Sequence, residues 1–104
     1  MVRVTVVYPN VPGSHFDVEY YLNTHVPLAN KLLEPAIQSL TVDIGVSGAL
    51  PEQQAPFAAI FNITCESAAV FAQAFEANAA ELQADITNYT DIIPVIQVSE
   101  IRIG

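Results

Sequence analysis

Apolar and polar residues alternate along three segments of the chain, 2–8, 40–46 and 57–65, as expected for β-strands with one buried face. A fourth segment, 92–103, is rich in isoleucine and valine and is predicted to be the last strand. It contains Pro94, which cannot donate a ladder hydrogen bond, so this strand is expected at a sheet edge or with irregular pairing. The proline-bounded segment 48–56 is predicted to turn the second strand into the third as an antiparallel hairpin.

Two other segments carry apolar residues at helical spacing. The first follows Asp17, a favourable N-cap, and runs to Leu33. Pro27 lies inside it and removes a backbone hydrogen bond, which predicts a kink or restart between Thr24 and Pro27. The second helix is expected to open at Glu66 or Ser67, with a short helical extension over 79–86.

The predicted order is therefore strand, helix, strand, strand, helix, strand, the ferredoxin-like βαββαβ arrangement of the α+β class. Right-handed crossovers place both helices on one face of a four-stranded antiparallel sheet. The opposite face offers Val7, Ala58, Ile60 and part of the last strand, and we expect it to be too apolar to stay in water. Two sheets packed face to face would cover it, giving a homodimeric α+β barrel. At 104 residues the chain is expected to form one domain, 1–104.

The charge balance restricts the partners. Three basic residues stand against eleven acidic ones, and the net charge of −8 argues against binding to nucleic acid or to an anionic membrane. No apolar run is long enough to span a bilayer, and no secretory signal is visible. The single cysteine, Cys65, is expected to be a small core residue in a protein of a reducing compartment, and we predict a cytoplasmic location.

Most cofactor sites are not supported by the composition. Glycine occurs only at positions 13, 45, 48 and 104. The sequence therefore contains neither the glycine motif of a dinucleotide-binding site nor that of a phosphate-binding loop. Two histidines and one cysteine make a three-ligand metal site hard to build. We therefore expect no cofactor and no metal, although a single histidine could still serve as an axial ligand to haem.

The segment from Asp17 to Pro27 contains the residues best suited to chemistry. Tyr21 and His25 are four residues apart, so their side chains meet on one helical face. An imidazole can take or give a proton near neutral pH, and a tyrosine hydroxyl can polarise a carbonyl. The alternative is that His25 is a core histidine bonded to a backbone carbonyl.

Further candidates surround this pair. Tyr8 ends the first strand on its core side and Tyr89 precedes the last strand, and both could close one end of a cavity between sheet and helices. Asp85 is expected at a solvated helix end, Asp91 in a turn, and His15 in an exposed loop. The catalytic candidates are His25, Tyr21 and Tyr89, and the candidate substrate contacts are Tyr8, Asn30, Asp85, Phe61 and Leu28.

Several motifs together resemble the EthD family over nearly the whole chain. They are Val2–Asn10, Tyr20-Tyr21 followed by His25-Val26-Pro27-Leu28, and Asn88-Tyr89-Thr90-Asp91 followed by Pro94–Glu100. The resemblance implies a dimeric α+β barrel and a pocket at Tyr21, His25, Tyr89 and Tyr8. Family members resemble small catabolic proteins first associated with ether degradation beside a cytochrome system, fungal relatives resemble polyketide-processing dehydratases, and the wider superfamily includes cofactor-free monooxygenases and lactone isomerases. The "reductase" label often given to the family has no support here, because no site for NAD or flavin is visible.

The sequence thus predicts a small cofactor-independent protein that binds a small apolar organic molecule. The leading hypothesis is an enzyme using acid/base chemistry at His25, of isomerase, dehydratase or oxygenase-like type. One alternative is a non-catalytic carrier or sensor of a hydrophobic metabolite. Another is an accessory interaction module of a degradation pathway, whose apolar sheet face docks a different protein.

Overall fold

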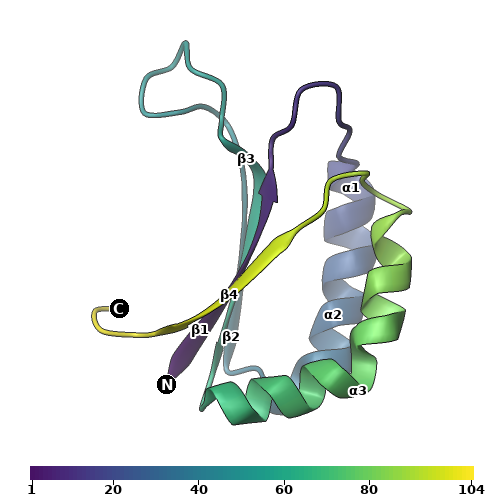
Figure 1. Ribbon diagram of the computed structural model, residues 1–104, viewed down its shortest axis with the longest axis vertical. Helices are drawn as coiled ribbons and strands as arrows, with labels where there is room; N and C mark the ends of the chain where they lie inside the picture. Colours follow the sequence, from purple (N-terminus) through teal and green to yellow (C-terminus); the bar gives the residue numbers. More distant parts are fainter.

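Four antiparallel strands form a single sheet in this computed structural model, which describes residues 1–104. The strands are β1 (Val2–Pro9), β2 (Ser39–Ile44), β3 (Phe57–Cys65) and β4 (Val95–Glu100). Their order is β2-β3-β1-β4, and the helices lie on one face of the sheet (Figure 1). This is the predicted ferredoxin-like α+β fold, and the last strand, β4, lies at an edge as expected, with Pro94 just before it.

The first helical segment changes its winding where Pro27 was expected to disturb it. Asp17 caps α1 (Val18–Tyr20) by accepting a hydrogen bond from the Tyr20 N–H at 3.1 Å. A π-helical turn, η1 (Tyr21–His25), separates α1 from α2 (Val26–Leu33). The Val26 N–H donates to the Tyr21 carbonyl, five residues back. The disturbance predicted near Pro27 therefore takes the form of a π-helical turn. This wider turn accommodates Pro27, whose nitrogen has no hydrogen to donate.

The second helix, α3 (Ala68–Ile86), is continuous and includes the predicted extension. The Ser67 hydroxyl accepts a hydrogen bond from the Val70 N–H at 3.2 Å, so Ser67 is the N-cap. In Figure 1 α3 bends, and its second half runs alongside α1 and α2. This bend brings the C-terminal end of α3 beside the π-helical turn.

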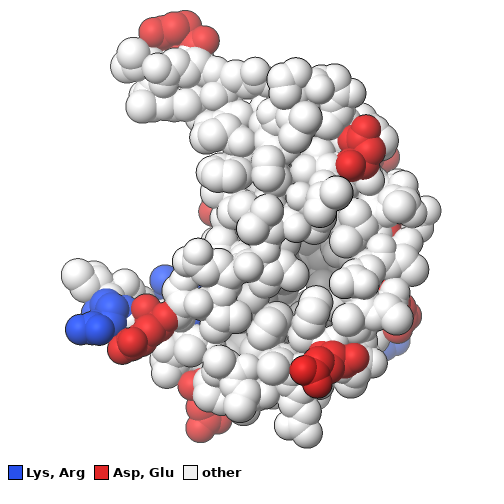
Figure 2. Space-filling model, in the orientation of Figure 1, with Lys and Arg blue, Asp and Glu red and all other residues white.

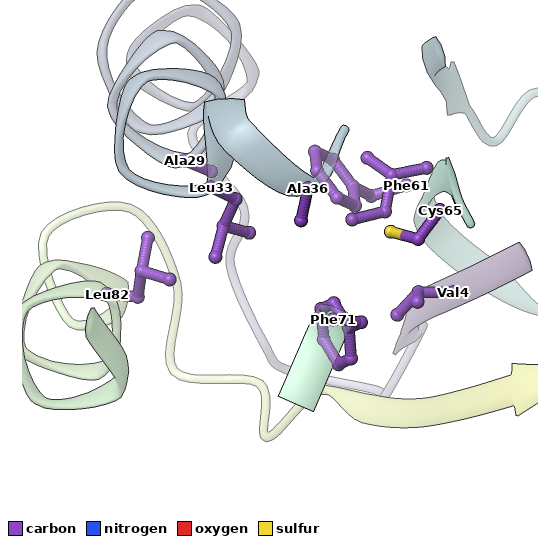
Figure 3. Close-up of a cluster of buried hydrophobic side chains, with 9 residues drawn as sticks. Val4, Ala29, Leu33, Ala36, Phe61, Cys65, Phe71 and Leu82 are labelled. Carbon is purple, nitrogen blue, oxygen red and sulfur yellow. The ribbon is translucent and has the colours of Figure 1, made fainter. Parts of the chain in front are cut away.

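The main core lies where the two helical segments meet the sheet. In Figure 3, Leu33 and Leu82 project from the helices while Val4, Phe61 and Cys65 project from the strands toward the same interior. Cys65 is fully buried, as predicted, and its burial raises the pKa of the thiol, so it stays protonated and unreactive. No helix combines the length and the apolar character that crossing a bilayer demands.

Two predicted strands are shorter than expected. β2 ends at Ile44 instead of residue 46, and Val46 is 93% exposed. Gly45 follows the strand, and a Cβ there would clash with the Phe57 carbonyl oxygen, so only glycine fits. β4 covers Val95–Glu100 instead of 92–103 because Pro94 ends the pairing on one side and Ile101 leaves the ladder on the other.

The sheet face away from the helices is less uniformly apolar than predicted. Strand pairing aligns Val7 with Ile60 and Val95, which makes one apolar row across three strands. The neighbouring row holds Thr5, Asn62 and Gln97, and is polar. The loop after β2 and the C-terminal segment both extend to this side of the sheet (Figure 1). They carry Val46 and Ile103, which are 93% and 94% exposed.

Candidate active site

A mostly apolar cavity of about 420 Å³ lies between the sheet and the helices. Fifteen of its 21 lining residues are hydrophobic, and the lining comes from β1, β3, β4, η1, α2, α3 and the connection before β4. The hollow is visible between the two layers in Figure 2. Its volume falls within the range of pockets that hold small organic molecules.

His25 lines this cavity from the last position of the π-helical turn. The residue is 7% exposed, and its Nδ1 lies 2.9 Å from Oδ2 of Asp85. Burial lowers the pKa of His25 below 6.5 and outweighs the opposing effect of the Asp85 carboxylate. His25 is therefore neutral at pH 7.

Asp85 holds the imidazole from the last turn of α3. Its Oδ1 accepts hydrogen bonds from the Tyr20 hydroxyl at 2.6 Å and from the Asn88 amide at 3.0 Å. Burial alone would raise the pKa of Asp85, but the bonds from Tyr20, Asn88 and His25 hold it below its usual 3.8. The expectation of a solvated helix end is wrong, since the Asp85 side chain is only 13% exposed.

This arrangement selects one tautomer of the imidazole. An ionised carboxylate can only accept hydrogen bonds, so the proton of neutral His25 lies on Nδ1 and is donated to Asp85. Nε2, on the opposite side of the ring, keeps its lone pair. A histidine oriented in this way by a carboxylate is equipped to act as a general base.

Three tyrosines and Phe16 form a buried aromatic cluster beside His25. The Tyr21 ring stacks on the imidazole with centroids 5.8 Å apart, and the Tyr89 ring lies 4.6 Å from it. The Tyr8 and Tyr89 hydroxyls are hydrogen-bonded at 2.8 Å. Burial raises the pKa of Tyr8, Tyr21 and Tyr89, so all three remain protonated and can donate hydrogen bonds.

The predicted site residues separate into three groups. Tyr8, Tyr21, His25 and Phe61 line the cavity. Tyr89 and Asp85 lie behind this wall, where they contact Tyr8 and His25. Leu28 is half-buried and Asn30 is exposed, and neither lines the cavity, because the helix turns them away from the face that carries His25 and Ala29.

Sequence reasoning missed the residues that hold Asp85, namely Tyr20 and Asn88. Asn88 follows Asp85 by three residues, a helical spacing that allows the two side chains to meet. Tyr20 gave no such signal, because its contact spans 65 positions of the chain.

A second histidine and carboxylate meet near the cavity. His15 is exposed, as predicted, and its Nδ1 lies 3.5 Å from Oδ1 of Asp91. The same oxygen accepts the His15 backbone N–H at 3.0 Å, which lowers the pKa of Asp91. Asp91 also lines the cavity, so an ionised carboxylate stands at its edge. No group of three or more His, Cys, Asp or Glu side chains is placed to hold a metal ion.

Comparison with known families identifies the fold and its relatives. The family model of the EthD domain matches residues 15–93. The chain belongs to the EthD family. An EthD-like protein from Ralstonia eutropha JMP134 is 37% identical with a TM-score of 0.93, and the match covers 99% of this chain and 93% of that one. No protein with a curated description matches.

More distant structures share the EthD fold. An EthD family protein from Bacillus halodurans C-125 is 20% identical with a TM-score of 0.74, over 96% of this chain and 97% of that one. The hydroxynitrile lyase of Passiflora edulis is 14% identical with a TM-score of 0.65, over 99% of this chain and 96% of that one. At these identities the likeness concerns the fold alone.

Proposed function

We propose that this EthD protein is an enzyme that moves a proton on a small, mostly apolar organic molecule, with His25 as the general base. The proposal rests on the 2.9 Å contact between His25 Nδ1 and Asp85. This contact occupies one nitrogen of the neutral imidazole and leaves Nε2 free to accept a proton from a molecule in the cavity that His25 lines. A neutral base at the wall of an apolar pocket is matched to proton transfer near pH 7.

In this proposal Asp85 is a positioning residue, since it lies behind His25 and acts through it. Proton transfer of this kind suits an isomerase or a dehydratase. The hydroxynitrile lyase from Passiflora edulis shares the fold, so the fold is compatible with an enzymatic function. A cytoplasmic location belongs to the same proposal, because the chain has one cysteine, the buried Cys65, and no intrachain disulfide.

The functional unit in this proposal is a homodimer formed through the sheet face opposite the helices. The apolar row of Val7, Ile60 and Val95 crosses three strands of that face and ends beside Asp43 of β2. The loop after β2 and the C-terminal segment flank it with the exposed side chains of Val46 and Ile103 (Figure 1). A second copy of this face would cover all of these groups at once.

The dimer is tested by replacing Val7 with glutamate. The substitution puts a negative charge from each copy into the proposed apolar interface, so the mass measured by light scattering is expected to fall from dimer to monomer. Leu22→Glu is the matched control, because Leu22 is an exposed apolar residue of the helical layer. A wild-type monomer, or a dimer unaffected by Val7→Glu, would contradict the interface.

The enzymatic proposal is tested by presenting the protein with a panel of small neutral aromatic and carbonyl compounds. Native mass spectrometry identifies those that bind, and NMR follows each bound compound for chemical change between pH 5 and pH 8. We expect turnover that decreases as the pH falls through the lowered pKa of His25, because protonation removes the base. Binding with no change in any compound would favour the carrier or sensor instead.

A further inference from the structure

We infer that the molecule bound in the cavity is neutral and aromatic and carries a hydroxyl group, which donates a hydrogen bond to Nε2 of His25. This inference rests on the proposed role of His25 and adds the chemical class of the molecule on which it acts. Three features of the cavity support it: an open acceptor nitrogen, the absence of cations, and an apolar wall with aromatic side chains.

Nε2 of His25 is an acceptor that no group of the protein occupies. The imidazole makes its side-chain hydrogen bond through Nδ1, to Asp85 at 2.9 Å. Nε2 makes none, yet it is not among the sealed polar atoms that lack a partner, so it keeps accessible surface. Because His25 is 7% exposed and lines the cavity, that surface lies on the cavity side. A ligand that covers Nε2 without donating to it would leave a buried acceptor unpaired, which is unfavourable.

The hydroxyls around the cavity do not compete for this role. The Tyr8 hydroxyl is hydrogen-bonded to the Tyr89 hydroxyl at 2.8 Å, and the Thr90 hydroxyl donates to the His15 carbonyl at 2.6 Å. The Tyr21 hydroxyl is sealed and out of reach of a ligand. The imidazole Nε2 is therefore the inner polar atom that a ligand meets, and it favours a molecule that donates over one that only accepts.

The lining of the cavity disfavours a charged ligand. Its remaining polar residues, Gln83, Thr87 and Asp91, are exposed, and no lysine or arginine contributes to it. Asp91 is ionised, because the hydrogen bond from the His15 backbone N–H holds its pKa below the usual 3.8. An anion in the cavity would lose its hydration without finding a cation to pair with, and the apolar walls solvate a charge of neither sign. The ligand is therefore expected to be neutral.

The rest of the cavity accepts a flat aromatic body. Phe71 and Phe75 stack on each other along α3, with centroids 5.4 Å apart, and both line the cavity together with Leu33 and Phe61. Leu33, Phe61 and Phe71 point toward the same interior in Figure 3. Aromatic rings pack well on one another, so two fused six-membered rings match this surface better than a polar chain would.

A hydroxyl on an aromatic ring also suits His25 as a base. A phenol has a pKa of about 10, as free tyrosine does, so its proton is within reach of an imidazole. In the step the O–H bond breaks, the proton forms an N–H bond at Nε2, and the electron pair stays on the oxygen and delocalises into the ring. The resulting imidazolium is stabilised by the Asp85 carboxylate, 2.9 Å from Nδ1. The step consumes no co-reactant.

The first experiment compares the binding of 2-naphthol, its methyl ether 2-methoxynaphthalene, and 2-naphthoate by fluorescence titration at pH 7. The ether keeps the rings and the oxygen but cannot donate, and a purely apolar cavity would favour it as the more hydrophobic compound. We expect 2-naphthol to bind about fivefold more tightly than the ether, and at least about tenfold more tightly than 2-naphthoate. Equal or tighter binding of the ether would overturn the hydrogen bond to Nε2. Equal binding of 2-naphthoate would overturn the neutral class of ligand.

The second experiment repeats the comparison of 2-naphthol with its ether as His25 becomes protonated. The titratable groups that face the imidazole are Asp85 from α3, Tyr21 from η1 and Tyr89 from the connection before β4. The pKa of Asp85 is lowered by its hydrogen bonds and those of the tyrosines are raised by burial, so His25 alone of this set changes charge at mildly acidic pH. We expect the preference for 2-naphthol to disappear as the pH falls through the titration midpoint of His25, because a protonated Nε2 cannot accept. A preference that persists below this midpoint would overturn the inference.

The variant His25→Met gives an independent readout. Methionine is apolar and adapts to irregular spaces, so it removes the acceptor while keeping a wall at this position. We expect the ether to bind as it does to the wild type and the preference for 2-naphthol to be lost. His15→Met is the matched control and should keep the preference, because His15 is exposed and does not line the cavity. A folded His25→Met protein that still prefers 2-naphthol would contradict the assigned contact, and the pH series of the wild type decides the matter if this variant does not fold.

These measurements of binding separate the inference from the proposed function, which is judged by turnover. If compounds of the panel are converted and conversion is lost in His25→Gln, but 2-naphthol binds no better than its ether, the role of His25 stands and the hydroxyl-bearing ligand is wrong. If 2-naphthol is preferred through His25 but no compound is converted, the hydroxyl-bearing ligand stands, while the proposed base is wrong and the protein is a carrier or sensor.

Discussion

Replacing His25 with glutamine is expected to lower turnover of any substrate identified by at least about 1,000-fold, within the range that a general base contributes. Glutamine keeps much of the size of the imidazole, and its amide can still donate a hydrogen bond to Asp85. It cannot accept a proton at neutral pH. The loss should therefore appear in kcat, while substrate binding and dimerisation are retained.

The chain offers a matched control for this substitution. His15 is its other histidine, it also contacts a carboxylate, and it is exposed. His15→Gln removes the same chemical group from the surface and should leave kcat unchanged. Turnover by His25→Gln at the wild-type rate would remove His25 from the mechanism, whatever the effect of His15→Gln.

Asp85→Asn is expected to reduce kcat by at least about 100-fold while the cavity keeps its shape, because the group that orients the histidine is replaced by its neutral isostere. The carboxylate holds the proton on Nδ1 and raises the pKa of His25 relative to burial alone. Without it the imidazole can donate from Nε2, the wrong tautomer for a base. Loss of the negative charge also lowers the pKa of His25 further.

The pH profile distinguishes this positioning role from a structural one. In the wild type, kcat should fall as the pH decreases through the pKa of His25, below 6.5. In Asp85→Asn this acidic limb should move to still lower pH, because a buried imidazole without a negative charge beside it is harder to protonate. Tyr20→Phe, which removes one of the bonds to Asp85, should have a smaller effect on kcat. An unchanged acidic limb in Asp85→Asn would contradict the role of Asp85.

Much of the fold follows from local patterns. Alternation at Val2–Tyr8 and Phe57–Cys65 defines strands whose inner residues reach the core, and Ser67 marks the start of α3. The kink at Pro27 is also local, since a proline removes one hydrogen bond wherever it occurs in a helix. The strand ends were less predictable, because apolar residues continue past them: Val46 follows the end of β2, and Ile92 and Ile93 precede the start of β4.

The site was predictable only in part. The spacing of Tyr21 and His25 on one helix indicates that they meet, and the structure stacks them. The contact between His25 and Asp85 joins residues 60 positions apart, and it depends on the bend in α3, which no local pattern encodes (Figure 1). The same applies to Tyr8 and Tyr89, which are brought together by the sheet and the connection before β4.

Nitrogen-15 NMR of the imidazole rings, recorded across a pH titration, tests the central claim most directly, because it reads the protonation of each nitrogen of His25 without a substrate. At pH 7 we predict a neutral ring with its proton on Nδ1 and a bare Nε2, and a titration midpoint below 6.5. A ring that carries its proton on Nε2, or that is already charged at pH 7, would contradict a base held ready by Asp85.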